Sequence, residues 1–386
     1  MPVFDDGPRE LPGGADYLVS QFDYLNSSAR VEAAKVRAVV ERMFDRYPAQ
    51  TQEALRRRLR SVDNNTYLGA FFELALHDLL LRSGCRVLAV EPDLEDTLRS
   101  PDFLAETPEG QRFYLEATLA TGRSRSEEGA DRRLKEAFQA IDSVHSPDFF
   151  LELHIAGMPA APVSGGRLRR ALERWLNGLD YQQVRRIWDE SEERPFFPYE
   201  QHGVRFKILP IPRGASRGTM QRSRAIGVRM PEALWVQPQS AIKDAILAKA
   251  ARYGQLDAPY LVAINAMDDH VDEESAVDAA FGTPAVFVRR TRSGFAEHTG
   301  RDGDGIWCGR SGPVNTRVSG ILSTERLTPW SLAQSRARLI INPWSRHTLP
   351  DPPFPIDRLA VQQERLHRTD GLPFQKIFEL PDGWPG

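Results

Sequence analysis

The segment from Gly69 to Thr118 constrains the fold more than any other part of this chain of 386 residues. It begins inside an apolar helix, expected over about 66–83 and ended by Gly84 in a left-handed conformation. A short apolar strand, CRVLAV, and a hairpin with an acid on each arm follow. A helix that is apolar on almost every face must be buried, so Glu73 within it needs a partner or a function.

The hairpin is predicted from the strands FLAET and RFYLEATLA, which are joined by Pro108, Glu109 and Gly110. We consider the register in which residue 107 pairs with residue 111. It places Asp102 directly opposite Glu116, on the same face of the sheet. Two carboxylates that close repel each other unless a cation lies between them or one is protonated. A register slip of one residue would put them on opposite faces.

Composition excludes several classes of protein. The two cysteines, Cys85 and Cys308, can form neither a disulfide framework nor a four-thiolate zinc site. No apolar run approaches the roughly 20 residues that span a bilayer, and the N-terminus lacks the pattern of a signal peptide. We therefore expect a cytoplasmic protein without a membrane partner. The formal net charge of −3 excludes a globally basic nucleic-acid binder but not a local basic groove.

Other catalytic motifs find no support in the sequence. There is no G-x-S-x-G elbow and no phosphate-cradling P-loop. His77, on the buried helix, is expected to be a hydrogen-bonded core residue rather than a metal ligand. The arginine cluster at 56–60 is expected on a solvated helix face, with phosphate contact as the alternative.

The loop at 213–227 is rich in Gly, Arg and Ser. Its arginines are either lining a nucleic-acid channel or merely solvated, and the sequence leaves both open. The residues concerned are Arg213, Arg217, Arg222 and Arg224.

The order of these parts resembles the PD-(D/E)XK superfamily of restriction-endonuclease-like nucleases. The matching residues are Pro101-Asp102 at the start of one strand and Glu116-Ala117 on the next. The helix that carries Glu73 looks like the GxxxE helix of exonuclease-type members. The wider layout, over much of 60–350, is similar to a set of uncharacterised bacterial proteins.

The resemblance implies an α/β fold with an αβββαβ core and a mixed sheet. We expect a helical extension over 1–62, the core over 63–290 with an insertion at about 160–238, and a strand-rich part over 291–386 packed on the core. It also implies Mg²⁺ or Mn²⁺ held by the two hairpin acids and the carbonyl of Ala117, with Glu73 assisting.

The sequence departs from the family pattern at Thr118, which stands where the family has a lysine. A threonine cannot supply positive charge to the reacting phosphate. Lys249 and Tyr253, four residues apart, look like the Q/KxxxY helix of exonuclease-type relatives. Lys249 is therefore the leading candidate to replace the missing lysine, followed by Lys243 and Lys135.

These features lead to the hypothesis of a metal-dependent nuclease, endo- or exonucleolytic, whose partner is nucleic acid, with DNA preferred and phage defence as a biological setting. A second hypothesis is a catalytically degenerate protein on the same scaffold that binds nucleic acid or a protein partner. A third is a subunit of a homo-oligomer or defence complex, which should expose an apolar patch. Contact between Lys249 and the hairpin acids would favour the enzyme.

Overall fold

The computed structural model describes residues 1–94, 97–122, 125–190, 193–214, 224–231, 238–291, 294–309, 312–349, 352–363 and 365–386. The chain is of the mixed α/β class with a mixed sheet, as expected. It divides into two compact units. Unit 1 comprises residues 1–14, 20–122 and 236–386, and unit 2 comprises 15–19 and 123–235.

The boundary of the insertion differs from the prediction. Unit 2 begins at residue 123 rather than at about 160, because the helix and strand that follow residue 123 pack into a hydrophobic core of their own. The inserted part of the chain is therefore a compact unit of its own.

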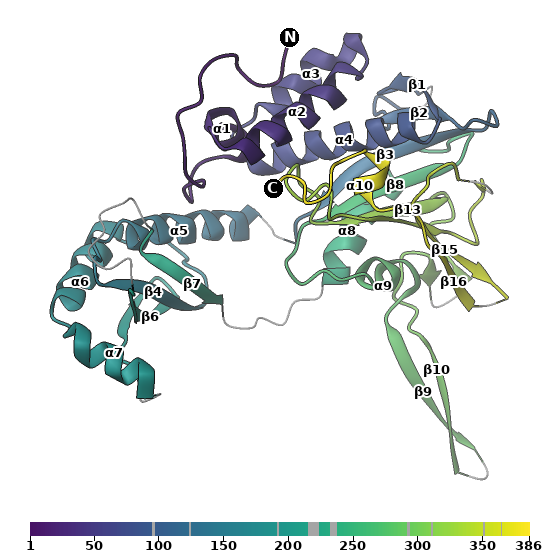
Figure 1. The fold of residues 1–386 in the computed structure, drawn as a ribbon. Helices are drawn as coiled ribbons and strands as arrows, with labels where there is room; N and C mark the ends of the chain where they lie inside the picture. Colours follow the sequence, from purple (N-terminus) through teal and green to yellow (C-terminus); the bar gives the residue numbers. More distant parts are fainter. Residues whose placement is uncertain are drawn as a thin grey trace. The chain divides into compact units, whose positions relative to one another are not determined.

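Unit 1 is built on an eight-stranded sheet with the order β1-β2-β3-β8-β13-β14-β15-β16 (Figure 1). Strands β1, β2 and β3 are antiparallel neighbours, whereas β3, β8 and β13 run parallel. The outer pairs alternate between antiparallel and parallel. The strands are β1 (Arg86–Val90), β2 (Phe103–Glu106), β3 (Arg112–Ala120), β8 (Tyr260–Ala266), β13 (Gly320–Glu325), β14 (Ala337–Ile341), β15 (Asp357–Gln362) and β16 (Arg365–Thr369).

The register of the acid-bearing hairpin is the one that we considered. Phe103 pairs with Leu115 across β2 and β3, and the Thr107 amide donates to the Gln111 carbonyl at 2.9 Å. Asp102 lies one residue before β2 and thus opposite Glu116 on β3, so the two acids share a face.

Helices cover both faces of this sheet. Those of unit 1 are α1 (Gln21–Ser27), α2 (Val31–Asp45), α3 (Ala49–Leu59), α4 (Asn64–Arg82), α8 (Pro238–Ala250), α9 (Ser275–Phe281) and α10 (Phe374–Ile377). Helix α4 packs with Phe113 and Leu115 of β3 on one face, and α8 packs with Tyr114 on the other (Figure 1). None of the helices in the described residues could cross a membrane.

Local signals in the sequence define the ends of α4. The Asp63 side chain accepts a hydrogen bond from the Thr66 amide and caps the first turn. Gly84 has a φ of +75°, a conformation that favours glycine. The helix is buried on nearly all sides, as its composition predicts.

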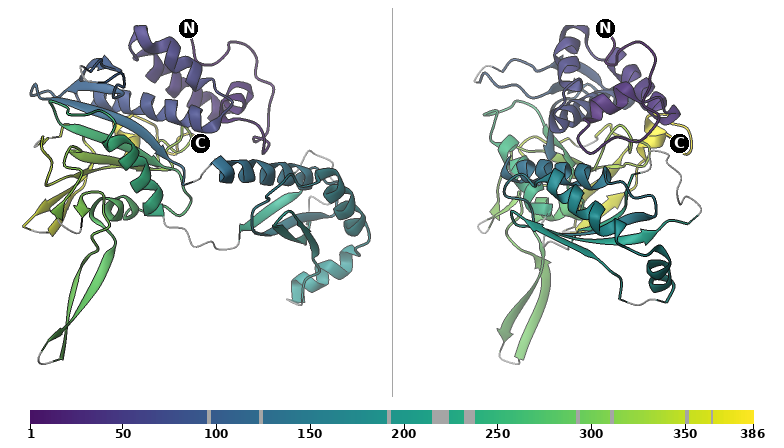
Figure 2. Two further views of the ribbon diagram at one scale, coloured as in Figure 1. Left: turned by 180° about the vertical axis from the view of Figure 1, so that it is seen from behind. Right: turned by 90° about the vertical axis from the view of Figure 1, so that its left-hand side faces the viewer.

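A two-stranded ribbon, β9 (Pro284–Thr291) with β10 (Gly294–Arg301), projects from unit 1 (Figure 2). This ribbon does not extend the main sheet, because β9 pairs only with β10 among the described strands. The short pair β11 (Cys308–Gly309) and β12 (Gly312–Pro313) is likewise separate. Val286 and Val288 on the ribbon are each 60% exposed, which is the kind of apolar exposure that the subunit hypothesis requires.

Unit 2 contains a four-stranded sheet with the order β5-β6-β4-β7. Its elements are α5 (Arg125–Asp142), β4 (Phe149–Ala156), α6 (Gly165–Asn177), α7 (Tyr181–Glu190), β5 (Phe197–Gln201), β6 (Val204–Pro212) and β7 (Ile226–Pro231). On β4, buried and partly buried residues alternate, as expected for a strand with one face on a core. That core is formed with leucines of α6 and apolar residues of α5.

The burial of α4 generates a stability prediction. Phe71 is fully buried on this helix, whereas Leu81 is 36% exposed. Phe71→Ala should lower the free energy of unfolding by about 3–5 kcal/mol through lost burial and the cavity left behind. Leu81→Ala, the matched control, should cost much less. Urea denaturation of both variants would measure the difference, and equal losses would contradict the packing described.

Candidate functional site

The two hairpin acids lie close together at the N-terminal end of β2. Glu116 is 2% exposed, and Asp102 is half-buried. The Asp102 Oδ2 atom accepts a hydrogen bond from the Ala117 amide at 2.6 Å. This bond links Asp102 to β3, the strand that carries Glu116. The relative position of the two acids is therefore fixed by a hydrogen bond to the backbone as well as by the pairing of β2 with β3.

The end of α8 and the turn after it bring three further side chains to Glu116. Lys249, in the last turn of α8, donates from Nζ to Glu116 Oε1. The Tyr253 hydroxyl donates to Oε2 at 2.6 Å, and Arg252 Nη1 lies 3.7 Å from Oε1. Both oxygens of this carboxylate are therefore held by residues more than 130 positions along the chain.

Glu73 reaches the same neighbourhood from α4 and is bound differently. Arg58 donates to both of its oxygens, at 2.6 and 2.9 Å, and the Tyr47 hydroxyl donates to Oε1 at 2.6 Å. The carboxylate is 3% exposed. A bidentate arginine and a tyrosine satisfy this buried charge, so Glu73 already has a complete set of protein partners.

Asp102 differs from the other two acids because no lysine or arginine in the described residues bonds to it. Burial, together with the negative charges of Glu116 and Glu73, raises the pKa of Asp102 to about 8. The Ala117 amide and the charge of Lys249 offset part of this shift. Three carboxyl groups thus share a site in which two cations make direct hydrogen bonds, and the charges of the other two acids favour the protonated form of Asp102.

The backbone of Ala117 is directed toward Asp102. Successive residues of a strand point their backbone groups to opposite edges. The Tyr114 amide donates toward the β8 edge, to the Pro259 carbonyl at 2.7 Å. Ala117, three residues later, therefore presents both its amide and its carbonyl to the β2 edge, beyond the last pair of that ladder.

Buried tyrosines surround the acids as neutral donors. Burial and the nearby Glu116 raise the pKa of Tyr253 above its usual value. Burial and the nearby Glu73 do the same to the pKa of Tyr47. Both hydroxyls remain protonated at physiological pH and orient the carboxylates that they contact.

The other lysines and Thr118 are placed as follows. Thr118 is half-buried on β3, on the same face as Glu116, and pairs with Ile264 of β8. Lys243 donates to the Asp304 carbonyl and does not join the acids. Lys135 lies in unit 2, 2.8 Å from Asp131. Of the three candidate lysines, Lys249 is the one that the structure brings to the acids.

The sequence left open whether the arginines of the 213–227 loop line a channel or are solvated, and the two described ones make contacts within unit 2. Arg213 is 4% exposed and donates to the Phe149 carbonyl at 3.1 Å, because it packs into the core of unit 2. Arg224 is partly exposed and lies 3.6 Å from Asp142. Arg217 and Arg222 lie outside the described residues.

Several residues of the site were missed by sequence reasoning. Arg58 belongs to the cluster expected on a solvated helix face, yet it pairs with Glu73. Its neighbours Arg56 and Arg60 also donate inward, to the carbonyls of Pro2 and Val3. A buried glutamate does signal that a cation is required, but nothing in the pattern identifies which one.

His77 is a core residue, as expected. Its ring packs against Tyr47 and Phe103, with centroids 4.8 and 6.0 Å away. A hydrogen-bonded residue was expected, but the Nδ1 atom has no hydrogen-bond partner among the described residues. Burial lowers the pKa of His77 to about 4, so the ring is neutral and contributes packing.

No family model, curated protein or solved structure matches the chain. Nor do the described residues contain a group of three or more His, Cys, Asp or Glu arranged to hold a metal ion. Inferences about function therefore depend on the contacts within unit 1.

The raised pKa of Asp102 generates a pH prediction. The folded chain keeps this proton up to about pH 8, whereas the unfolded chain loses it near 3.8. In chelator, stability should therefore fall as the pH rises through this window. Asp102→Asn removes the charge and keeps an acceptor for the Ala117 amide. Its melting temperature should match wild type near pH 4 and exceed it near pH 8.

Asp45→Asn, which changes an exposed carboxylate at the end of α2, is the control and should leave the pH profile of wild type unaltered. Thermal denaturation across the pH range measures all three proteins. Parallel profiles for Asp102→Asn and wild type would show that Asp102 is not strained by neighbouring charge.

Proposed function

We propose that the chain is a metal-dependent nuclease that hydrolyses phosphodiester bonds in nucleic acid. The observation that carries this proposal is the convergence of Lys249 and Tyr253 on Glu116, directly beside Asp102. Two acids on paired strands, with a lysine ammonium in contact, supply the ligand oxygens and the positive charge that phosphoryl chemistry requires.

The order of elements supports the resemblance noted in the sequence. Helix α4, strands β1, β2 and β3, helix α8 and strand β8 follow the αβββαβ order, with unit 2 inserted between β3 and α8. The threonine in the lysine position is compensated in this interpretation by Lys249, which approaches the same carboxylate from α8.

The donor set suits Mg²⁺ or Mn²⁺. Asp102 Oδ1 accepts no hydrogen bond from the described residues, and the Ala117 carbonyl is directed to the same edge. Each oxygen of Glu116 accepts one hydrogen bond, which leaves lone pairs for a metal. A divalent cation here would neutralise the excess charge that raises the pKa of Asp102. Glu73, bound by Arg58 and Tyr47, would act through its charge instead of as a ligand.

The residues of the chain would then divide the work. The metal would polarise the phosphate and favour attack by water. Tyr253 would hold Glu116 in its ligating orientation. Lys249 would stabilise the negative charge that develops on the phosphate oxygens as the water oxygen bonds to phosphorus and the bond to a sugar oxygen breaks. One water is consumed for each bond that is cut.

Removing Glu116 tests the metal site. Glu116→Gln should abolish cleavage of plasmid, single-stranded DNA and RNA in Mn²⁺ or Mg²⁺, because it removes a charged ligand. Wild type should gain roughly 3 kcal/mol of stability at about 100 times the metal Kd, and the variant should gain much less. Cleavage assays and thermal shifts with chelator controls measure both. Unchanged cleavage by Glu116→Gln would refute the site.

The two lysines of α8 provide a matched pair. Lys249→Ala should lower the cleavage rate by about 10²–10³ with little change in the KM for the substrate, since its charge acts in the transition state. Lys243→Ala removes an equivalent charge on the same helix, directed at the Asp304 carbonyl, and should retain wild-type rates. Equal losses in both variants would indicate a general electrostatic effect.

A catalytically degenerate protein that binds nucleic acid or a protein partner is the second candidate. One observation favours it: the described residues lack a ready-made group of three metal ligands. In that case wild type would cleave no substrate with either metal, and nucleic-acid binding would persist in chelator.

A further inference from the structure

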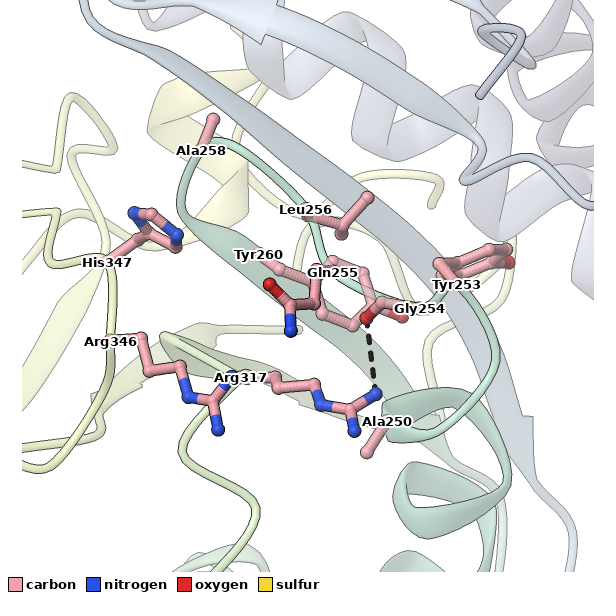
Figure 3. Close-up of a pocket in the computed structure, with 10 residues that line it drawn as sticks. All are labelled: Ala250, Tyr253, Gly254, Gln255, Leu256, Ala258, Tyr260, Arg317, Arg346 and His347. Atoms are coloured by element: carbon pink, nitrogen blue, oxygen red, sulfur yellow. Dashed lines mark hydrogen bonds between the residues drawn. The ribbon is translucent and has the colours of Figure 1, made fainter. Parts of the chain in front are cut away.

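A pocket of about 60 Å³ lies beside the acid site, lined by the turn after α8 and by the loops before β13 and after β14 (Figure 3). Its walls carry Arg317, Arg346 and His347. Tyr253 is among the residues that line it, and the hydroxyl of that tyrosine bonds Glu116. One residue therefore belongs to both the pocket and the acid site.

The positive charge of this pocket is uncompensated. Arg317 and Arg346 are exposed, and in the described part of the chain neither has a carboxylate at salt-bridge distance. Arg317 donates one N–H to the Gly254 carbonyl at 3.2 Å, which leaves most of its five donors available. In Figure 3 both side chains extend from neighbouring loops toward the turn that carries Gly254 and Gln255.

A second, larger cleft of about 300 Å³ in unit 1 provides a contrast. It too is lined by arginines, but Arg336 lies 2.8 Å from Asp357 and Arg338 lies 2.7 Å from Glu273. These two arginines are paired within the protein, and the third arginine of the cleft, Arg326, donates to the Asp269 carbonyl at 2.8 Å. Among the described residues, the pocket at Tyr253 is thus the one of these two whose arginines all lack a carboxylate at salt-bridge distance.

Hydrogen bonds hold the walls of the pocket in place. The Ser319 hydroxyl accepts from the Tyr260 amide at 3.0 Å and donates to the His347 carbonyl at 2.6 Å. The Arg346 amide donates to the Thr316 carbonyl at 2.8 Å. The two basic loops are thus fixed to β8 and to each other, which reduces the entropy lost when a ligand binds.

We propose that this pocket binds a phosphate group of the nucleic-acid strand on which the acid site acts; the inference rests on the proposed function for the identity of that strand. Arginine forks match phosphate oxygens in geometry and charge. The volume, room for a few water molecules, suits a single phosphate. Tyr253 would then couple the position of the bound phosphate to the orientation of Glu116.

Binding in chelator tests the pocket without cleavage. Fluorescence anisotropy would compare short DNA and RNA oligonucleotides with and without a terminal phosphate. Arg317→Ala and Arg346→Ala should each weaken binding roughly tenfold and lower the salt slope by about 1. Arg365→Ala, which removes an exposed charge on β16, should bind as wild type does. A loss confined to phosphorylated oligonucleotides assigns a terminal phosphate; a loss with both assigns an internal one.

The phosphate site would be refuted if both arginine variants bound with the affinity and salt slope of wild type. It would also be refuted if wild type did not bind the oligonucleotides. The separate cleavage assay in Mn²⁺ distinguishes this failure from failure of the proposed function. If wild type cleaves and the arginine variants bind as wild type does, the phosphate site is rejected and the proposed function stands. Binding that depends on Arg317 and Arg346 without any cleavage by wild type removes the hydrolysis and leaves the phosphate site.

Discussion

Three carboxylates gathered around two directly bonded cations form the constraint on which this site depends. Glu73 lies on α4, which covers one face of the sheet, and the side chain of Glu116 lies on the other face. Each of these carboxylates is paired with its own cation. Asp102, one residue before β2, accepts a hydrogen bond from a backbone amide instead of a cation. A fold selected for stability alone would place a neutral residue here. A divalent cation would relieve the electrostatic repulsion among the three acids. Carboxyl groups whose pKa is perturbed in this way are typical of functional sites.

The topology explains how Lys249 can reach acids that precede it by more than 130 residues. Strands β3 and β8 are parallel neighbours, and a parallel connection requires a crossover, here supplied by α8. Unit 2 is inserted between β3 and α8 and has its own core, so it need not disturb that crossover. Separation along the sequence therefore places no limit on contact between Lys249 and Glu116.

Local signals in the sequence were sufficient for α4, for the hairpin register and for the pairing of Asp102 with Glu116, because caps, turn residues and strand alternation act over a few residues. The long-range approach of Lys249 was expected from the family resemblance, but the partner of Glu73 was not predictable: Arg58 belongs to a charge run that looks solvated, and its contact with Glu73 depends on how α3 packs against α4. The boundary of unit 2 was missed for the same reason. A strand such as β4 shows the same alternation of apolar and polar residues whether it packs in the core of unit 1 or of unit 2.

The proposed nucleic-acid substrate is a polyanion that the acid cluster would repel, so the basic residues around the acids would matter as much as the acids themselves. The chain as a whole is slightly acidic, so no general field draws nucleic acid toward it. Arg317 and Arg346 concentrate positive charge next to Tyr253. A phosphate held there would offset the repulsion of the backbone by the carboxylates, and the strand would be positioned by contacts that do not require a metal. Substrate binding and metal binding would then be separable properties of neighbouring residues.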